Sequence, residues 1–309
     1  MRLKFSVQLP TDRVGEVQEF GTTAAISAIA RAIEEAGFDA CFVTEHPFPS
    51  DRWLEHGGHH ALDPFVVLAV AAAATREIRL HTNILVLPYR NPFLVAKAIA
   101  SLDVVSGGRV IVGAGAGYLE REFDALGANF DERNETFDDA LVAMKAAWAG
   151  ESVVMSKPGF RANGNTMRPR PVQRPHPPIW IGGNSPRAIR RAVDFAEGWS
   201  PFPLQTAHAG VVRSSAIESI DELRSGITRM REYATGQGRD TPLDVNFVPF
   251  GLPMNVRSLP EDDEIHEQLA GLEAAGVTWV SLGLPTWSRA SYLESLARFG
   301  EVFIPSRTG

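Results

Sequence analysis

The stretch PIWIGGNSP, residues 178–186, contains the residue pattern that decides the fold. Its apolar start, residues 179–181, is typical of a buried strand, and the two glycines that follow end that strand. The Ser-Pro pair at its end begins a helix, because serine caps a first turn and proline is favoured at the first helical position. The stretch therefore predicts one strand–loop–helix unit.

The same unit recurs along the 309-residue chain. Asp63-Pro64 and Asn91-Pro92 repeat the pairing of a capping side chain with a proline. Eight runs are rich in Val, Ile and Phe and are mostly apolar on both faces, as expected of a buried parallel sheet: Leu3–Leu9, Ala40–Thr44, Ile78–Leu87, Val110–Ala114, Pro178–Ile181, Trp199–Phe202, Val245–Phe250 and Val277–Leu282. Eight such repeats favour an α/β fold of the (β/α)₈ TIM-barrel type. An open doubly wound sheet is the alternative, and the sixth run is the weakest of the set.

Two connections are longer than ordinary loops, Glu151–Pro177 and Pro203–Ser219. The first is rich in proline, and we expect it to form a hairpin or an insertion lid, near residues 151–177, over the barrel mouth. Neither connection is typical of a linker between domains, so we expect residues 1–309 to form a single domain.

Composition limits the classes of function. The net charge is −7 and no basic block is present, which argues against nucleic-acid binding. No run approaches the roughly 20 apolar residues that span a bilayer, and the N-terminus shows no leader, so we expect a cytoplasmic protein that does not contact membranes. The single cysteine, Cys41, lies in an apolar run, so it is expected in the core and cannot form an internal disulfide.

Candidate site residues follow the strands, because function in such barrels lies at the carboxyl ends of the strands. Gly182 and Gly183 precede a helix start whose free amides suit a phosphate; an ordinary capped turn is the other interpretation. The glycine-rich run 113–118 fails the dinucleotide fingerprint at Tyr118, although its small residues permit a flat ligand to approach the strand. His46 directly follows a buried strand, where an imidazole can exchange a proton with a ligand.

A cluster of histidines supports a second class of function. His46, His56, His59 and His60 lie among acidic residues, as in a metal-dependent barrel hydrolase. However, two glycines at 57 and 58 break any helix that would align the histidines. We therefore expect residues 50–62 to form a loop whose histidines line the pocket, and we assign no metal ligand.

Four segments carry a resemblance to a known family. They are FVTEHP (42–47), HTNILVLPYRNP (81–92), the stretch from LDVVSGGR to GY (102–118) and PIWIGGN (178–184). In order and spacing they resemble the bacterial luciferase-like monooxygenase superfamily, and within it the deazaflavin-dependent oxidoreductases that use coenzyme F420. The resemblance covers residues 1 to about 200 well and the remainder by pattern.

The resemblance implies a (β/α)₈ barrel whose mouth is shielded by the insertion at 151–177. It implies a non-prolyl cis peptide at Asn83–Ile84 behind the flavin-like ring, and an active-site role for His46. The implied cofactor-binding residues are His46, Asn83, Ile84, Gly115, Ala116, Gly117, Gly182, Gly183, Asn184 and Ser185. One position departs from the pattern: Tyr118 stands where the sugar-phosphate dehydrogenases of the group have a glutamate.

Together these features predict an oxidoreductase that uses coenzyme F420 or FMN for hydride transfer or monooxygenation of a small organic substrate. His46 and Tyr118 are the predicted catalytic residues: His46 donates or accepts a proton, and Tyr118 and Asn83 orient the ring or substrate. The resemblance further implies a homodimer and a separate reductase that supplies reduced cofactor. The metal-dependent hydrolase and a non-catalytic member of the superfamily are the other hypotheses.

Overall fold

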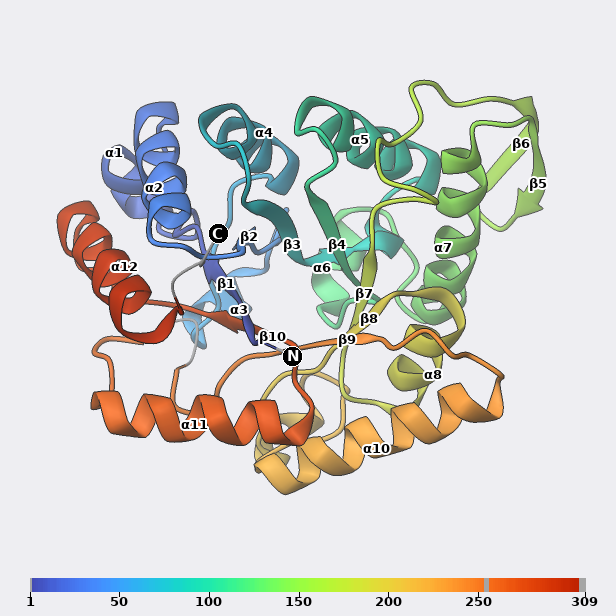
Figure 1. The fold of residues 1–309 in the computed structure, drawn as a ribbon. Coiled ribbons are helices and arrows are strands. Elements are labelled where there is room, and N and C mark those ends of the chain that lie inside the picture. The colour runs from blue at the N-terminus through green and yellow to red at the C-terminus, as the bar shows by residue number, and fades with distance from the viewer. Residues whose placement is uncertain (1, 253–255, 306–309) are drawn as a thin grey trace.

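A computed structural model describes residues 2–252 and 256–305. Its eight parallel strands close into a barrel in the order β1-β10-β9-β8-β7-β4-β3-β2 (Figure 1). The strands are β1 (Lys4–Gln8), β2 (Ala40–Val43), β3 (Arg79–Val86), β4 (Val110–Gly115), β7 (Ile179–Gly182), β8 (Gly198–Ser200), β9 (Asp244–Phe247) and β10 (Trp279–Leu282). Each overlaps one of the eight predicted runs, so the TIM barrel is confirmed and the open sheet is not formed.

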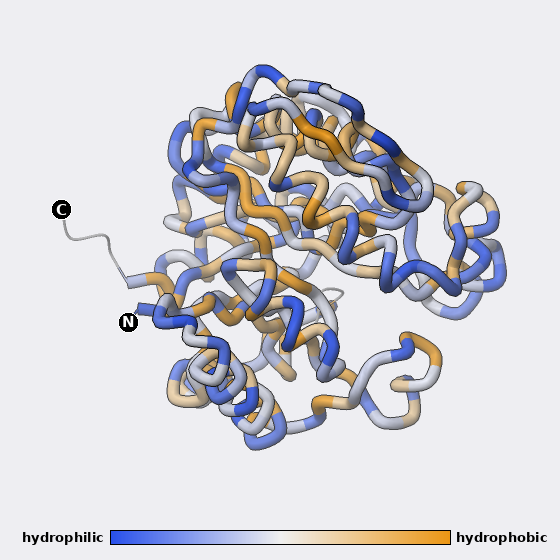
Figure 2. The backbone as a smooth tube through the Cα atoms, turned by 90° about the vertical axis from the view of Figure 1, so that its right-hand side faces the viewer, coloured by the Kyte–Doolittle hydropathy of each residue, from blue (hydrophilic) through white to orange (hydrophobic). Residues whose placement is uncertain are grey.

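Helices surround the barrel, and apolar stretches run through the interior while the outer loops are mostly hydrophilic (Figures 1 and 2). The main helices are α2 (Thr23–Glu35), α4 (Pro64–Ala74), α5 (Pro92–Val105), α7 (Arg133–Ala149), α8 (Pro186–Phe195), α10 (Ile220–Gly236), α11 (Asp262–Ala275) and α12 (Arg289–Phe303). The short ones are η1 (Val14–Glu16), α1 (Val17–Phe20), α3 (Asp51–Glu55), η2 (Leu87–Tyr89), α6 (Glu120–Ala125) and α9 (Thr206–Ala209). None of the described helices is long and apolar enough to cross a membrane.

The predicted helix starts are built as expected. The side chains of Asp63, Asn91 and Ser185 accept hydrogen bonds from backbone N–H groups in the first turns of α4, α5 and α8, with proline at the first position of each helix. These caps fix where each helix leaves the barrel mouth, and therefore where the loop before it lies.

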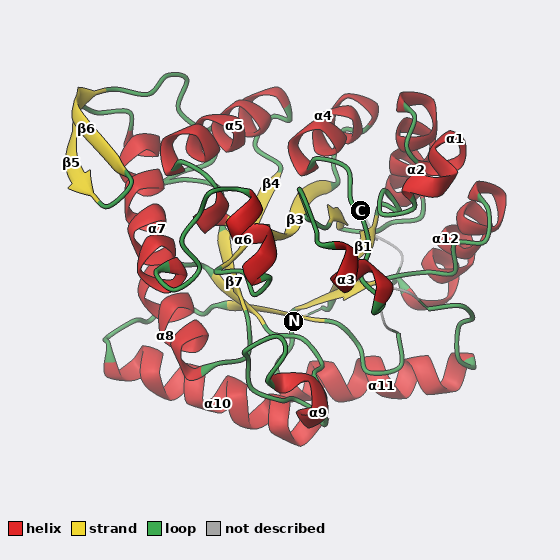
Figure 3. Ribbon diagram, turned by 180° about the vertical axis from the view of Figure 1, so that it is seen from behind, coloured by secondary structure: helices red, strands yellow, loops and turns green. Residues whose placement is uncertain are grey.

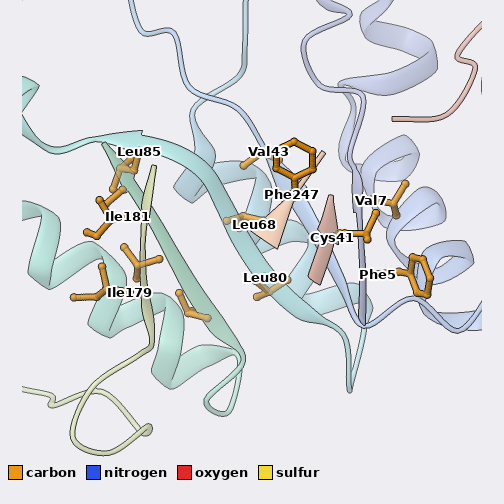
Figure 4. Packing of buried hydrophobic residues seen from close by; sticks show 14 of the residues in the cluster. Phe5, Val7, Cys41, Val43, Leu68, Leu80, Leu85, Ile179, Ile181 and Phe247 are labelled. Atoms are coloured by element: carbon orange, nitrogen blue, oxygen red, sulfur yellow. The ribbon is translucent and has the colours of Figure 1, made fainter. Parts of the chain in front are cut away.

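The core lies between the barrel and its helices. Outward-facing strand residues such as Val7, Cys41 and Leu80 are buried in one hydrophobic cluster that includes Leu68 of α4 (Figure 4). Cys41 is fully buried, which confirms its core assignment, and burial raises the pKa of its thiol to about 12. Side chains on the alternate strand positions point into the barrel interior.

The insertion forms a hairpin but not the expected lid. Strands β5 (Val153–Lys157) and β6 (Phe160–Asn165) pair antiparallel on the flank of the barrel, outside α5 and α7 (Figures 1 and 3). Phe160 packs edge-on against Phe93 of α5, and Val172 and Gln173 donate backbone hydrogen bonds to Asp103 at the opposite end of that helix. The insertion follows the end of α7, and its hairpin then lies along the outer side of that helix, where Lys157 pairs with Asp139 at 2.7 Å, instead of crossing the ends of the strands.

Other segments cover the mouth. The short helices α3 and α6, and the long connection that contains α9, follow β2, β4 and β8 and lie on the side that faces the viewer in Figure 3. A backbone bridge between Leu204 and Ile217 closes the base of the last of these segments. The segment that covers the site is therefore the second long connection, Pro203–Ser219.

Candidate active site

A cavity of about 430 Å³ opens at the carboxyl ends of β2, β3, β4, β7 and β8. Its volume lies within the range of small-molecule and cofactor sites. Of the residues predicted from the sequence, those that line it are His46, Asn83, Ile84, Gly115, Ala116, Gly117, Tyr118, Gly182, Gly183 and Ser185. Residues separated by more than 130 positions in the chain thus share one cavity.

Ile84 and two glycines form the floor of this cavity. The peptide bond between Asn83 and Ile84 is cis, at the position that the resemblance implied. A Cβ atom on Gly182 would lie 2.3 Å from Ile84 Cδ1, and one on Gly115 would lie 3.1 Å from Ile84 Cγ2. The two glycines therefore leave room for the Ile84 side chain across the ends of β4 and β7. The resulting floor is apolar, and no side chain projects from positions 115 and 182, which suits a flat ring.

Asn184 does not line the cavity. Its buried side chain donates to the carbonyl oxygens of Phe202 and Ser215 and accepts from the Phe202 N–H, so it ties the β7 loop to the segment after β8. The amides expected to bind an anion are also partly used: Gly183 N–H donates to Ser200 O, and Asn184 N–H donates to Ser214 Oγ. In this structure the polar atoms of the Asn184 side chain bind the protein itself, and its contact with a cofactor stays a prediction.

The positive charge at this end of the cavity comes instead from arginine side chains. Arg133, Arg187 and Arg213 line it, and the guanidinium carbons of Arg133 and Arg213 lie 4.0 and 4.5 Å from the centre of the Phe130 ring. Burial and then repulsion by Arg213 lower the pKa of Arg133. Arg187 and Arg213 are partly offset by Glu135 at 3.6 Å and Glu120 at 3.3 Å. Like charges placed this close favour an anionic ligand.

The arginines were missed by the sequence reasoning for different reasons. Arg187 lies in the first turn of α8, directly after the glycine loop, and its position next to a proposed phosphate site was a usable signal. Arg133 and Arg213 come from α7 and from the long connection after β8, and no local pattern relates them to the glycines. Only the closed fold brings them together.

His46 and Tyr118 both line the cavity. The His46 ring packs at 4.3 Å from Trp53 and lies 3.4 Å through Nδ1 from the Glu122 carboxylate. Burial and then the charge of Glu122 raise the pKa of Tyr118 to about 12. Tyr118 is therefore neutral at physiological pH and can donate a hydrogen bond into the cavity.

The other histidines do not converge with His46 on a metal site. His56 Nδ1 donates to Arg52 O at 2.6 Å, and His59 Nδ1 donates to His60 O at 2.8 Å. His59 packs against His46, but the histidines at 56, 59 and 60 do not line the cavity, so that expectation was wrong. Within residues 2–252 and 256–305, no three His, Cys, Asp or Glu side chains form a group that could hold an ion.

A second hollow of about 350 Å³ opens near the carboxyl ends of β1 and β10. Its walls include Gln8, Asp12, Arg13 and Trp287. Burial raises the pKa of Asp12, and the charge of His59 opposes this shift. His46 lines the first cavity and not this hollow.

Comparison with known proteins decides the family. The family model described as luciferase-like monooxygenase matches residues 3–279, most of the chain. The chain belongs to the luciferase-like monooxygenase family. Its members are oxidoreductases, and the barrel with its cavity at the strand ends is consistent with an enzyme of this kind.

Individual relatives of the luciferase-like family agree. An F420-dependent glucose-6-phosphate dehydrogenase of Microbacterium testaceum is 32% identical over 203 residues, which are 64% of this chain and 56% of the relative. The solved monooxygenase RslO1 of Streptomyces bottropensis superposes with a TM-score of 0.79 at 22% identity, covering 98% of this chain and 99% of that one. An F420-dependent secondary alcohol dehydrogenase solved with an F420–acetone adduct has a TM-score of 0.77 at 16% identity, covering 98% of both chains. The two structures support the barrel fold.

Proposed function

We propose that this protein is an oxidoreductase that binds coenzyme F420, with FMN as the alternative cofactor, and acts on a small organic molecule by hydride transfer or monooxygenation. One observation carries the proposal: a single cavity combines the apolar floor at Ile84 with an arginine-lined end. Such a cofactor has a flat ring joined to a phosphate-bearing tail. The ring would contact the apolar floor, and the phosphate would contact the arginines. The F420-dependent relative and structural neighbour favour the deazaflavin.

The residues present fit such a cofactor. The ring would rest on Ile84, above the positions where Gly115 and Gly182 lack side chains. The anionic end would lie near Gly183 and Ser185, where Arg133, Arg187 and Arg213 supply the charge. Since the N–H groups of Gly183 and Asn184 already donate to Ser200 and Ser214, the arginines would supply most of the contacts to the anion.

The bound cofactor supplies the transfer of a hydride at its ring, and the protein must position the reactants and manage a proton. His46 holds or releases that proton at the cavity wall, and the neutral Tyr118 donates a hydrogen bond to ring or substrate. Asn83 lines the same wall and orients the ring. We place the substrate in the same cavity, next to the ring and to the side chains of His46 and Tyr118.

Two partners complete the proposal. Reduced cofactor would come from a separate reductase. We also propose a homodimer through the outer faces of α4 and α5, because α4 has no charged residue and a helix that is apolar all round is normally buried. Val66 of α4 and Leu94 of α5 are 64% and 71% exposed in the single chain.

Parallel fluorescence titration of the apoprotein with oxidised F420 and with FMN tests the cofactor. We expect saturable binding of F420 that is tighter than that of FMN. Arg133→Gln should weaken it by about tenfold or more, since a hydrogen bond to a charged group contributes about 1.5–3 kcal/mol. Arg224→Gln on α10, which removes an exposed ion pair with Asp221, is the matched control.

Other outcomes point to other functions. Binding of neither cofactor would favour the non-catalytic hypothesis. Stoichiometric zinc in the purified protein, removed by His46→Ala, would favour the metal-dependent hydrolase. Equal loss in Arg133→Gln and Arg224→Gln would show that the arginine cluster does not bind the anionic end.

A further inference from the structure

Glu122 is a buried carboxylate in the wall beside the cavity. It lies in α6, and the residue is 1% exposed. Its Oε1 accepts from the backbone N–H of Phe48 at 2.9 Å, and its Oε2 accepts from Tyr89 Oη at 2.8 Å and lies 3.4 Å from His46 Nδ1. Three groups from three segments therefore meet one side chain. A buried charge is tolerated when it is satisfied in this way.

The proton positions in this cluster follow from the chemistry of its members. Burial opposes ionisation of Glu122, but the hydrogen bonds from His46, Phe48 and Tyr89 outweigh it and hold the pKa of the carboxyl below its usual value. Burial and then the charge of Glu122 raise the pKa of Tyr89, so Tyr89 keeps its proton. An ionised carboxylate only accepts hydrogen bonds, and His46 must therefore carry a proton on Nδ1.

We propose that Glu122 is a positioning residue that holds His46 in the Nδ1–H tautomer and leaves Nε2 as the nitrogen that exchanges the proton. This inference rests on the proposed function for the role of His46. The ring is also fixed by packing, with Trp53 at 4.3 Å and the edge of His59 at 4.9 Å. Since Nδ1 and Nε2 lie on opposite sides of the ring, one hydrogen bond decides which nitrogen is available.

The groups that face His46 support the same assignment. From α6 and the loop before it come the ionised Glu122 and the neutral Tyr118, and from η2 comes Tyr89 behind Glu122. From the segment after α3 comes His59, whose pKa burial lowers, with Asp12 beyond it. Glu122 is thus the negative charge in direct contact with the His46 ring.

The substitution Glu122→Gln separates positioning from a purely structural role. The backbone N–H of Phe48 can only donate, so it holds the single amide oxygen of glutamine on its own side. The amide nitrogen then faces His46 Nδ1 and Tyr89 Oη, both of which can accept. His46 is forced to the Nε2–H tautomer, with almost no change in side-chain volume.

The experiment compares wild-type protein, Glu122→Gln, Glu122→Asp and the control Asp124→Asn, an exposed carboxylate on the same helix. Ring ¹⁵N NMR of histidine-labelled apoprotein near pH 8 reads the tautomer without cofactor, with His46→Ala assigning the signal. We expect Nδ1–H in wild type, Asp124→Asn and Glu122→Asp, and Nε2–H in Glu122→Gln. Turnover of Glu122→Gln should fall by roughly 10²–10⁴-fold, the usual contribution of acid–base catalysis, with unchanged cofactor affinity.

The outcomes are distinguishable. An Nδ1–H signal in Glu122→Gln, or wild-type turnover in that variant, would overturn the inference. If Glu122→Gln does not fold, retention of the Nδ1–H tautomer and of most turnover in Glu122→Asp supports positioning, and an Nε2–H signal in the wild-type protein contradicts it. A tautomer switch in a protein that binds neither F420 nor FMN would support the role of Glu122 while refuting the proposed function.

Discussion

His81 lies fully buried inside the barrel, on the inner face of β3. Its ring packs against Trp180 at 4.8 Å, and Ser6 Oγ lies 3.5 Å from its Nδ1. Burial, and then the charge of Arg79, lowers its pKa to about 3. The imidazole is therefore neutral in the folded protein over the whole physiological range.

This burial predicts a pH dependence of stability. In the unfolded chain the imidazole has its ordinary pKa of about 6.5, so acidification from there towards pH 3 protonates the unfolded state first and favours unfolding. The free energy of unfolding should fall by about 2 kcal/mol from pH 7.5 to pH 5 through this residue. Urea unfolding at both values checks it. His81→Gln should lose that part of the slope, and an identical slope in the variant would contradict the assignment.

Single residues mark the limit of the sequence reasoning. His46, Tyr118 and the glycines were found because they directly follow strands, and the ends of parallel strands share one edge. Glu122 was not found from the sequence. Glu120 and Glu122 cannot be told apart by any sequence pattern, and only the turn of α6 buries Glu122. The inward polar residues Ser6, His81 and Asn246 also break the expectation that the strands are apolar on both faces.

Elements were predicted well where local rules apply. Alternation of apolar runs with capped helices gave all eight barrel strands, because each signal spans only a few residues. The predicted path of the insertion was wrong, because its proline content does not encode which elements the insertion packs against. The contacts that fix it, Phe160 with Phe93 and Lys157 with Asp139, join residues far apart in the sequence.

The placement of the hairpin gives a test at this scale. Replacing residues 153–165, which comprise β5 and β6, by a short Gly-Ser linker should leave cofactor affinity within about twofold of wild type, because no residue of that range lines the cavity. Replacing residues 205–216 should weaken binding strongly, because Val212, Arg213 and Ser214 do line it. Fluorescence titration compares the two. A larger loss of cofactor affinity in the variant without residues 153–165 would support the predicted lid instead.

At the scale of the whole molecule, one barrel carries every described strand except the flanking hairpin, and we infer a single domain over 1–309. The outer surface is uneven in polarity. Helix α4 contributes exposed Val66 without any charged neighbour on the same helix, and the adjacent α5 contributes Leu94 and Val105. Residues 64–74 contain no charged side chain, but only the fold shows that one side of α4 is left uncovered.

The proposed dimer follows from this face. Val66→Glu combined with Leu94→Glu should convert a dimer to monomers, because each charge would be repeated across a two-fold interface and would lose water on association. Light scattering coupled to size exclusion measures the mass. Val154→Glu, on the flanking hairpin and 76% exposed, is the matched control. A monomeric wild-type protein, or a double variant that remains dimeric, would reject this face as the interface.

The mutual fit of Ile84 with Gly115 and Gly182 has a practical consequence for engineering. A side chain at Gly182 or Gly115 would require Ile84 to shift or to be replaced by a smaller residue, since a Cβ atom at these positions would lie 2.3 Å from Cδ1 and 3.1 Å from Cγ2 of Ile84. The base of the chamber is therefore best varied as a set, whereas the wall residues Val212 and Arg213 come from a separate segment, the connection after β8. A library intended to broaden the range of accepted compounds is best started in that connection.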